Sequence, residues 1–280
     1  MRTKELFAFI KERHAIYIRR AAGQPKPWTR DPILQQYRFC NIYRELDAVT
    51  QWIAANWRKP HKADTHLWFA MVVARLFNSP ETLQAIGYSV PWQPSRVKKI
   101  LHERQDVGLR NFNTAYMVAT NGCVMNKIEY LAQYVLEPLW RDRKKINAVY
   151  STCNTLAWFH RLLMQYQGLG SFMAAQVVAD LKYVQPLHSA TDWWMWAASG
   201  PGSRRGLNRV MGYEVNAPWN EATWYLNLMT LKAAIDPLVA KAGMPPIHAQ
   251  DLQNSLCEWD KYERTRLGQG RPRQLYPGGA

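Results

Sequence analysis

Hydrophobic residues recur at three- and four-residue spacing along most of the chain, whereas the alternation typical of strands is scarce. In residues 33–57 the stripe consists of Phe39, Ile42, Tyr43, Leu46, Val49, Trp52 and Ile53. This period predicts an all-α protein, with residues 33–57 as one amphipathic helix. Further helices are expected over residues 65–76, from 79 on, and over 93–105, 128–146, 152–166, 172–181, 220–242 and 249–264.

Breaks rich in proline and glycine at residues 24–27, 199–202 and 244–246 separate the predicted helices. We therefore expect an N-terminal helix and linker over residues 1–29 and a two-lobed helical catalytic and DNA-binding domain over 30–263. Residues 264–280 lack apolar periodicity and are expected to form a flexible basic tail.

The net charge distinguishes this sequence from that of an ordinary helical protein. Lys and Arg outnumber Asp and Glu 36 to 21, which gives a formal net charge of +15. A polyanion is the natural partner of such a chain. The chain also holds 13 Trp and 14 Tyr, and aromatic faces beside cations suit unstacked bases, although most of these rings are expected to fill the core.

Other function classes are disfavoured by the same composition. The four cysteines are widely spaced without a CxxC pair, and the histidines form no HxxxH or HExxH pattern, so neither a disulfide framework nor a protein-bound metal is indicated. The charged N-terminus lacks the apolar stretch of a signal peptide, and no run is long enough for a membrane helix. We expect a protein without membrane partners.

The most informative local pattern is Gly168-Leu-Gly170 between two helical segments. Glycines at a tight turn permit left-handed backbone, and the N–H groups that open the second helix can hold a DNA phosphate. Gly168, Gly170 and Ser171 are therefore predicted to bind DNA as a helix-hairpin-helix. An ordinary helix C-cap remains the alternative.

Asp192 follows Gly170 by 22 residues and precedes Trp193. Over residues 162–192 the sequence resembles the helix-hairpin-helix DNA glycosylase superfamily, whose catalytic aspartate follows the hairpin at about this distance. The lysine nucleophile of its bifunctional members would fall near Ala174, where this chain has none. The alternative for Asp192 is a cap on a helix that begins at Trp193.

A second dense patch over residues 199–209 combines glycine, serine and three arginines. We expect it to be a flexible loop that binds an oxyanion, with Ser203, Arg204, Arg205 and Arg209 as contacts. It is not a P-loop, because GxxxxGK[ST] is missing. A solvated basic loop that contacts the DNA backbone is the alternative.

Three polar clusters lie among apolar residues at helical spacing. Such groups are either satisfied buried networks or the lining of a site, because an unpaired one costs about 1–3 kcal/mol. We predict that two of the clusters bind substrate, and leave the third as structural. The first two are Arg38, Asn41, Arg44 and Asp47, and Arg75 with Asn78; the third is Asn254, Glu258, Asp260 and Lys261.

Four segments together are similar to one phage family, the 5-hydroxymethyluracil DNA kinase helical domain and the alpha-glutamyl/putrescinyl thymine pyrophosphorylases. Members are linked to thymine hypermodification, and some are regarded as amino acid:DNA transferases. The resemblance spans most of residues 30–263. It is carried by Tyr37-Arg-Phe-Cys-Asn-Ile-Tyr-Arg-Glu-Leu-Asp, Ala74-Arg-Leu-Phe-Asn, Gly200-Pro-Gly-Ser-Arg-Arg-Gly-Leu and Asn254-Ser-Leu-Cys-Glu-Trp-Asp-Lys-Tyr.

The resemblance implies transfer of an amino acid, such as glycine, to 5-(pyrophosphoryloxymethyl)uracil in double-stranded DNA, with release of pyrophosphate. Arg204 and Arg205 would then stabilise the leaving group, and Asp192 would take a proton from the attacking ammonium. Trp193 would hold an extruded base. Addition of a thiol, Cys40 or Cys257, to the uracil ring is a further option.

Two other functions stay open. One is base excision, as in the glycosylases, and the other is a non-catalytic DNA-binding helical subunit of a DNA base kinase. For the transferase, free amino acid is the second substrate, and no cofactor is expected beyond a Mg²⁺ carried by pyrophosphate. The cytoplasm of an infected bacterial host is the expected location, and the sequence leaves the oligomeric state open.

Overall fold

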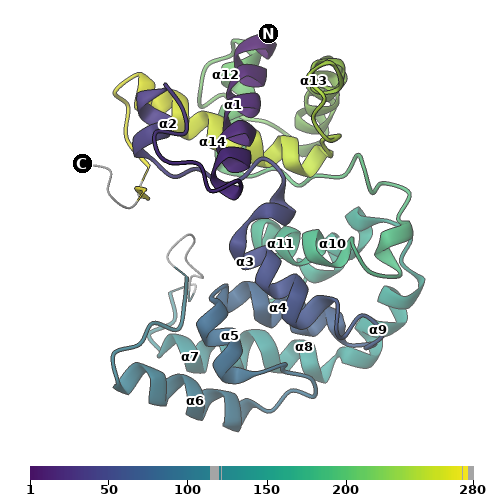
Figure 1. The fold of residues 1–280 in the computed structure, drawn as a ribbon. Coiled ribbons are helices and arrows are strands. Elements are labelled where there is room, and N and C mark those ends of the chain that lie inside the picture. Colours follow the sequence, from purple (N-terminus) through teal and green to yellow (C-terminus); the bar gives the residue numbers. More distant parts are fainter. Residues whose placement is uncertain (114–119, 121, 273, 277–280) are drawn as a thin grey trace. The chain divides into compact units, whose positions relative to one another are not determined.

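The computed structural model describes residues 1–113, 120, 122–272 and 274–276, and these are helical apart from turns, loops and one isolated bridge between Tyr37 and Leu275 (Figure 1). The prediction of an all-α protein is confirmed. The chain divides into two compact units, unit 1 with residues 1–47 and 194–280 and unit 2 with residues 48–193. The boundaries expected after residues 29 and 263 both fall inside unit 1.

Unit 2 is a continuous stretch of chain built from helices and short helical turns. Its first half contains α3 (Ala48–Ile53), the π-helical turn η2 (Ala54–Arg58), α4 (Leu67–Phe77), α5 (Pro80–Ile86) and α6 (Pro94–Asp106). Its second half contains α7 (Lys127–Tyr130), the π-helical turn η3 (Leu131–Leu136), α8 (Glu137–Arg141), α9 (Arg143–Thr152), α10 (Leu156–Leu163), α11 (Ser171–Leu181) and the 3-10 turn η4 (Leu187–Ser189).

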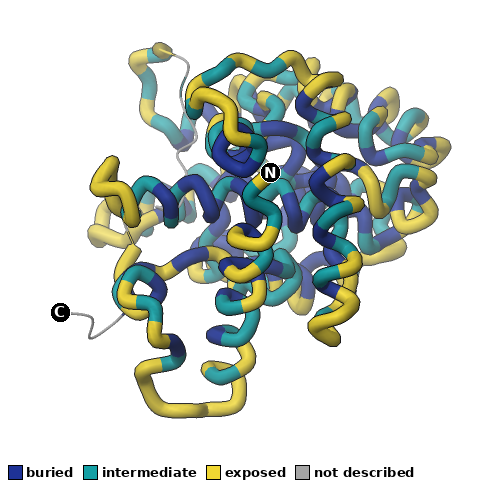
Figure 2. The backbone as a smooth tube through the Cα atoms, turned by 90° about the horizontal axis from the view of Figure 1, so that it is seen from above, coloured by how far each residue is buried: buried dark blue, intermediate teal, exposed yellow. Residues whose placement is uncertain are grey.

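Helix α4 forms the centre of unit 2. All eleven of its residues are buried, as expected for a helix that is apolar on every face, and α11 packs along it. Many of the other helices alternate between buried and exposed residues, which Figure 2 shows as alternating dark and yellow stretches. The charged exception on α4 is Arg75, which must therefore be satisfied inside the core.

Unit 1 is built from the N-terminal and the C-terminal parts of the chain. It contains α1 (Thr3–Ala21), α2 (Pro32–Gln36), the 3-10 turn η1 (Arg44–Leu46), α12 (Pro201–Met211), α13 (Glu221–Lys241) and α14 (Ala249–Arg266). Its core is formed by apolar side chains of α1, α12, α13 and α14. Helices α12 and α14 lie against each other because α12 has Gly206 at their contact, where a Cβ would come within 2.1 Å of the Leu256 carbonyl oxygen.

Two predicted helices are interrupted in the structure. Residues 33–57 do not form one helix, because the chain leaves the helical conformation after Gln36 and regains it only at Arg44. Over this break the Asn41 amide donates to the Leu46 carbonyl and to Asp47, so side chains replace the helical backbone bonds. The stretch 128–146 is helical as predicted through α7, η3 and α8, and is divided only at Asp142, before α9 begins.

The expected loop over residues 199–209 is also wrong, because Pro201–Met211 form helix α12. Gly200 is the N-cap residue, proline occupies the first turn and the Ser203 hydroxyl bonds back to Gly200. These are strong helix-start features. Glycine content had suggested flexibility, but Gly202 and Gly206 instead allow close packing on α14.

The described part of the expected tail is partly ordered. Helix α14 continues to Arg266, and the chain from Gln274 to Tyr276 pairs with the segment after α2. The Tyr276 side chain is 4% exposed and packs edge-on against Trp28. Residues 273 and 277–280 of the tail lie outside the described residues.

Candidate functional site

Helices α10 and α11 contact each other as a helical hairpin across the turn that contains Gly168 and Gly170. Gly168 adopts φ +80°, and a Cβ there would come within 2.6 Å of the Val135 side chain. Gly170 is the N-cap residue of α11 with φ −60°, and nothing lies within 4 Å of where its Cβ would be. The left-handed backbone expected at the turn is thus present at Gly168, and His160 ties the two helices together through the Ser171 carbonyl, 2.9 Å away.

The start of α11 has the features of an anion site. Within the described residues the side chain of the N-cap position makes no capping hydrogen bond, and the positive end of the helix dipole lies at Ser171. On α10, an exposed tryptophan and an arginine lie beside a hollow of about 440 Å³, lined by Trp158, Arg161, Leu162 and Gln165. An aromatic ring next to a guanidinium suits nucleic acid.

Asp192 caps the hairpin's first helix. Its Oδ1 accepts a hydrogen bond from the Leu156 N–H at 2.7 Å and its Oδ2 from the Ala157 N–H at 3.0 Å. The cap therefore serves α10, which lies 36 residues before it, and not a helix beginning at Trp193. The structure fixes this carboxylate against the hairpin by two charge-assisted bonds.

Trp193 lies beside a buried lysine. Its indole N–H donates to the Lys182 carbonyl at 2.6 Å, and the Lys182 ammonium donates to the Trp193 carbonyl at 3.0 Å while lying 4.0 Å from the ring centroid. These contacts hold the ring in one orientation. The role predicted for Trp193, which is to hold an extruded base, remains a prediction.

Arg75 and Asn78 belong to a buried hydrogen-bond network that includes Asp180 of α11. Nε and Nη2 of Arg75 lie 2.5 Å from the two carboxylate oxygens of Asp180, which is fully buried. Arg75 also donates to Asn78 and Thr50, both at 3.1 Å. The network links the hairpin's second helix to the central helix α4, so these contacts account for a structural role of the pair in unit 2.

Arg204 holds the loop that joins α12 to α13. Its guanidinium donates to the Ser199 hydroxyl at 2.8 Å, the Trp219 carbonyl at 3.0 Å and Glu221 at 2.9 Å. Burial opposes ionisation of Glu221, but bonds from Ser199 and Arg204 outweigh it and hold the pKa of Glu221 below its ordinary value. Ser203 is fully buried, and its hydroxyl is used at the start of α12.

Arg205 and Arg209 meet at one buried carboxylate. Asp260 on α14 is fully buried and accepts from Arg205 Nε at 2.8 Å and from Arg209 Nε at 2.9 Å. A third guanidinium, that of Arg264, lies 3.5 Å away. This arrangement joins α12 to α14, and Arg205, with a side chain 32% exposed, still reaches the surface.

The first predicted cluster lies in the loop between α2 and α3. Asn41 and Asp47 bond to each other, and burial raises the pKa of Asp47. The Arg44 backbone N–H donates to Asp251, while Arg38 is exposed and its backbone N–H donates to the Gln274 carbonyl. Asn41 and Asp47 therefore shape the loop, and the other two place their backbones against neighbouring segments.

The two cysteines considered as nucleophiles lie beside Glu258. Its carboxylate raises the pKa of the Cys40 thiol well above the ordinary value, and burial raises the pKa of Cys257 to about 11. A thiol attacks as the thiolate. The surroundings therefore disfavour nucleophilic attack by either cysteine at neutral pH.

The predicted site residues are divided between the two units. Unit 1 holds the loop cluster and the α12 set, namely Arg38, Asn41, Arg44, Asp47, Ser203, Arg204, Arg205 and Arg209. Unit 2 holds the α4 pair and the hairpin set, namely Arg75, Asn78, Gly168, Gly170, Ser171, Asp192 and Trp193. Both units are basic, since residues 48–193 contain 16 Lys and Arg against 9 Asp and Glu, and the remainder 20 against 12.

Comparison with known protein families identifies the family of this chain. Residues 2–271 match the family described as the helical domain of 5-hmdU DNA kinase. The chain belongs to this family. The expected relationship to phage thymine-hypermodification proteins is thereby confirmed, and the 5-hmdU DNA kinase helical domain covers both units described above.

A curated relative shares this domain. The chain is 26% identical over 285 aligned positions to a protein named 5-hmdU DNA kinase from Bacillus phage SP10. The match covers 91% of this chain but 44% of the relative, so the chain spans less than half the length of that kinase. No solved structure matches significantly.

The described residues of this helical domain contain neither a cluster suited to a metal ion nor a helix suited to a membrane. No group of three or more His, Cys, Asp and Glu side chains is placed to hold a metal ion. None of the described helices is long and apolar enough to cross a membrane.

The sequence analysis did not single out several residues that form buried ion pairs or line a hollow in the structure. Asp180 could have been noticed as the lone acid within the apolar run Val177-Val-Ala-Asp-Leu. Asn208, Trp219 and Tyr213, which line a hollow in unit 1, have no sequence pattern that separates them from ordinary core and loop residues.

Proposed function

We propose that this helical domain recognises DNA that carries 5-hydroxymethyluracil or a derivative of it, in the hypermodification of thymine in phage DNA. The observation that carries the proposal is the hairpin, with left-handed backbone at Gly168 and the positive end of the α11 dipole at Ser171. Such a start binds phosphate through backbone N–H groups, which are indifferent to base sequence. The family match and the excess of basic residues support the same partner.

As the reaction, we propose transfer of an amino acid to 5-(pyrophosphoryloxymethyl)uracil. The amine nitrogen forms a bond to the exocyclic carbon while the bond from that carbon to the pyrophosphate oxygen breaks, and the electron pair leaves with pyrophosphate. Asp192 takes the ammonium proton, because each of its oxygens uses only one lone pair toward the start of α10. Stabilisation of the leaving group by Arg204 and Arg205 is a separate proposal, because these two residues belong to unit 1 and Asp192 belongs to unit 2.

A second candidate function is non-catalytic DNA binding beside a kinase. It is favoured by the engagement of Arg204 with Glu221 and of Arg205 with Asp260, which are structural contacts. It is also favoured by the description of the matched family as the helical domain of a kinase. In this case the chain would deliver modified DNA to a phosphorylating partner.

The deciding experiment is mass spectrometry of nucleosides from DNA bearing 5-(pyrophosphoryloxymethyl)uracil after incubation with the protein and a pool of amino acids. A new thymidine adduct together with released pyrophosphate supports the transferase and identifies the donor. Unchanged DNA that is bound supports the second candidate. Loss of the free base would instead indicate excision, as in the glycosylases that the hairpin resembles.

A binding experiment tests recognition separately from chemistry. Affinity is measured for matched duplexes that contain thymine or 5-hydroxymethyluracil, over a range of salt concentrations. Log affinity should fall with log salt with a slope of about −0.9 per phosphate contact. Tighter binding of the modified duplex supports the proposal, whereas equal affinity for both duplexes contradicts recognition of the modified base.

A further inference from the structure

Three arginines of unit 1 meet at one buried carboxylate, that of Asp260 on α14. Arg205 and Arg209 come from α12, whereas Arg264 lies one turn after Asp260 on α14 itself. The carboxylate balances one of the three positive charges, so the cluster keeps an excess of two. Cations held this close together repel one another, and a bound anion would offset that repulsion.

Two of the three guanidiniums are anchored at one edge and open at the other. Arg205 donates to Asp260 Oδ2 through Nε at 2.8 Å, and Arg264 Nε lies 3.5 Å from the same oxygen, so the two guanidiniums are neighbours. The Arg205 side chain is 32% exposed and that of Arg264 is 37% exposed. Within the described residues the Nη groups of both bind no acceptor, and unlike the buried Arg264 Nε they are accessible to solvent.

The third guanidinium, that of Arg209, holds the carboxylate from the inside. Its Nε donates to Asp260 Oδ1 at 2.9 Å and its Nη2 donates to the Gln269 side chain at 3.0 Å, and its side chain is 5% exposed. Asp260 is therefore fixed through one oxygen and orients Arg205 and Arg264 through the other. Donors oriented before a ligand arrives lose less conformational entropy when they bind it.

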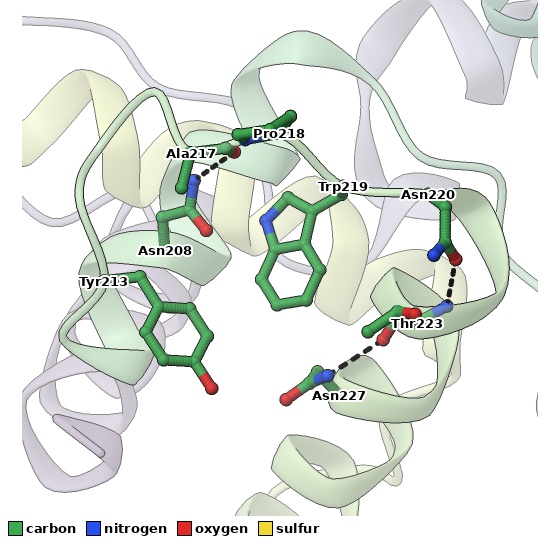
Figure 3. Close-up of a pocket in the computed structure, with 8 residues that line it drawn as sticks. All are labelled: Asn208, Tyr213, Ala217, Pro218, Trp219, Asn220, Thr223 and Asn227. Carbon is green, nitrogen blue, oxygen red and sulfur yellow. Dashed lines mark hydrogen bonds between the residues drawn. The ribbon is translucent and has the colours of Figure 1, made fainter.

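Other polar features of α12 are less suited to an anion. Asn208 lines a hollow of about 310 Å³ near the start of α13, and the described residues around it include no charged side chain (Figure 3). Arg204 uses Nε, Nη1 and Nη2 on protein acceptors. The guanidinium of α12 with open donors is thus that of Arg205, and its neighbour at Asp260 is Arg264.

We propose that Arg205 and Arg264 bind a phosphate group with two or more negative charges, and that Asp260 positions both guanidiniums. A guanidinium pairs with two phosphate oxygens, and an excess of two positive charges matches a pyrophosphate or phosphomonoester better than a singly charged backbone phosphodiester. This inference deepens the proposed function and rests on it for the source of the phosphate. The source is the pyrophosphoryl group of 5-(pyrophosphoryloxymethyl)uracil in DNA or free pyrophosphate.

The first test titrates the protein with sodium pyrophosphate in an isothermal calorimeter at low ionic strength. Arg264→Gln is the most informative variant, because Arg264 Nε makes no hydrogen bond and its loss leaves Arg205 and Arg209 on the carboxylate. We expect Arg264→Gln and Arg205→Gln each to bind pyrophosphate about tenfold more weakly. Urea unfolding midpoints verify that both variants are folded.

The matched control is Arg266→Gln on the same helix. The Arg266 side chain is 46% exposed, but its Nε and Nη2 both donate to Glu263 at 2.7 and 3.0 Å, so this guanidinium is already paired with its own carboxylate. Arg266→Gln should bind pyrophosphate like the wild type. Equal losses in Arg266→Gln and Arg264→Gln, or wild-type protein without saturable pyrophosphate binding, would overturn the proposal.

The second test identifies the source of the phosphate by competition. Wild-type protein loaded with pyrophosphate is titrated with a duplex that holds one 5-(pyrophosphoryloxymethyl)uracil and with its thymine counterpart. Displacement by the modified duplex alone assigns the site to the pyrophosphoryl group on DNA, and displacement by neither assigns it to free pyrophosphate. Equal displacement by both duplexes would contradict the preference for a doubly charged group.

The outcomes separate this inference from the proposed function. If wild-type protein transfers an amino acid while Arg205→Gln and Arg264→Gln bind pyrophosphate as tightly as the wild type, the function stands and the phosphate site fails. If both variants lose pyrophosphate binding while wild-type protein neither prefers modified DNA nor transfers an amino acid, the phosphate site stands and the proposed function fails.

Discussion

The guanidinium of Arg75 and the carboxylate of Asp180 form a two-point ion pair inside unit 2, with both nitrogen–oxygen distances at 2.5 Å. Arg75 is 3% exposed and Asp180 is fully buried. The pair joins the central helix α4 to α11, the helix whose start is proposed to bind phosphate. Stability of the core and placement of the hairpin are therefore coupled through these two residues.

Replacing Asp180 by Asn should destabilise unit 2 strongly. The substitution leaves the buried Arg75 guanidinium without its charged partner, which costs about 3–5 kcal/mol. Urea unfolding followed by circular dichroism measures the change. As a control, Glu129→Gln removes a half-exposed partner of Lys98 and should cost less than about 1 kcal/mol. Similar costs for both variants would contradict the structural role of Asp180.

Gly206→Ala should destabilise unit 1. The new Cβ would lie 2.1 Å from the backbone carbonyl oxygen of Leu256, which cannot move by a rotamer change, so α12 and α14 must separate. We expect a cost of about 3 kcal/mol from thermal or urea unfolding. Gly200→Ala on the same helix has open space around its Cβ and should cost less than about 1 kcal/mol. An unaffected Gly206→Ala would contradict the close packing.

Ser171→Glu should separate stability from DNA binding. A carboxylate at the start of α11 interacts favourably with the helix dipole and should stabilise by roughly 0.3–1 kcal/mol. It also repels the phosphate proposed to bind there, so affinity falls and the salt slope shrinks by about 0.9. Ser95→Glu, an exposed position in the first turn of α6, is the matched control and should retain DNA affinity. Equal affinities in the two variants would remove the hairpin from the interface.

Glu221→Gln should weaken the dependence of stability on acidity. The folded-state pKa of Glu221 lies below its ordinary value of 4.5, so its contribution is present above about pH 4.5 and is lost as pH falls through the folded-state pKa. Urea midpoints at about pH 7 and about pH 3.5 should therefore differ less in the variant than in the wild type. An unchanged difference would contradict the Arg204–Glu221 contact.

Asp47→Asn should increase the difference between the urea midpoints at about pH 7 and about pH 3.5, which is the opposite of the change expected for Glu221→Gln. Burial raises the pKa of Asp47 above its ordinary value of 3.8, so its contribution to stability is greatest below that value and is lost as pH rises through the folded-state pKa. In the wild type this offsets part of the acid destabilisation. Removing the titrating group should therefore make the loss of stability between about pH 7 and about pH 3.5 larger.

Asp192→Asn tests the proposed proton acceptor. Asparagine retains one oxygen for the start of α10, so stability should fall by only about 1 kcal/mol. Amino acid transfer, measured by the mass spectrometric assay, should fall at least about a hundredfold if the carboxylate takes the proton. Asp142→Asn, a partly exposed carboxylate elsewhere in unit 2, should keep normal transfer. Turnover close to wild type in Asp192→Asn would contradict the assignment of Asp192 as the proton acceptor.

Much of the helical architecture follows from local sequence. Ser79 and Pro80 predict the start of α5, and the structure has a serine N-cap and a proline in the first turn there. The apolar run predicts a buried helix over residues 65–76, which the structure has at Leu67–Phe77, and the Gly168 turn predicts left-handed backbone. These features depend on residues close together in the chain, so their physical causes can be read from the sequence alone.

The failures have one cause, namely partners distant in sequence. Residues 199–209 look flexible because they are rich in glycine, yet Gly206 serves close contact with Leu256 on another helix. The contacts of Arg204 with Glu221 and of Arg205 with Asp260 likewise join residues far apart in the chain, and the sequence analysis did not anticipate them. Asp192 looks like the cap of the next helix, but it caps a helix that precedes it by 36 residues.

The sequence by itself determined the helical class, the basic charge and the glycine turn, because periodicity, composition and local dihedral preference need no knowledge of the fold. Only the tertiary structure decided which cations are held by carboxylates and which buried polar atoms have no partner among the described residues. The pairing of Arg75 with Asp180, and the burial of Trp219 Nε1 and Asn208 Oδ1 without a hydrogen-bond partner among the described residues, arise from packing between separate helices and loops. Such pairings are set by three-dimensional proximity, which no pattern along a single chain specifies.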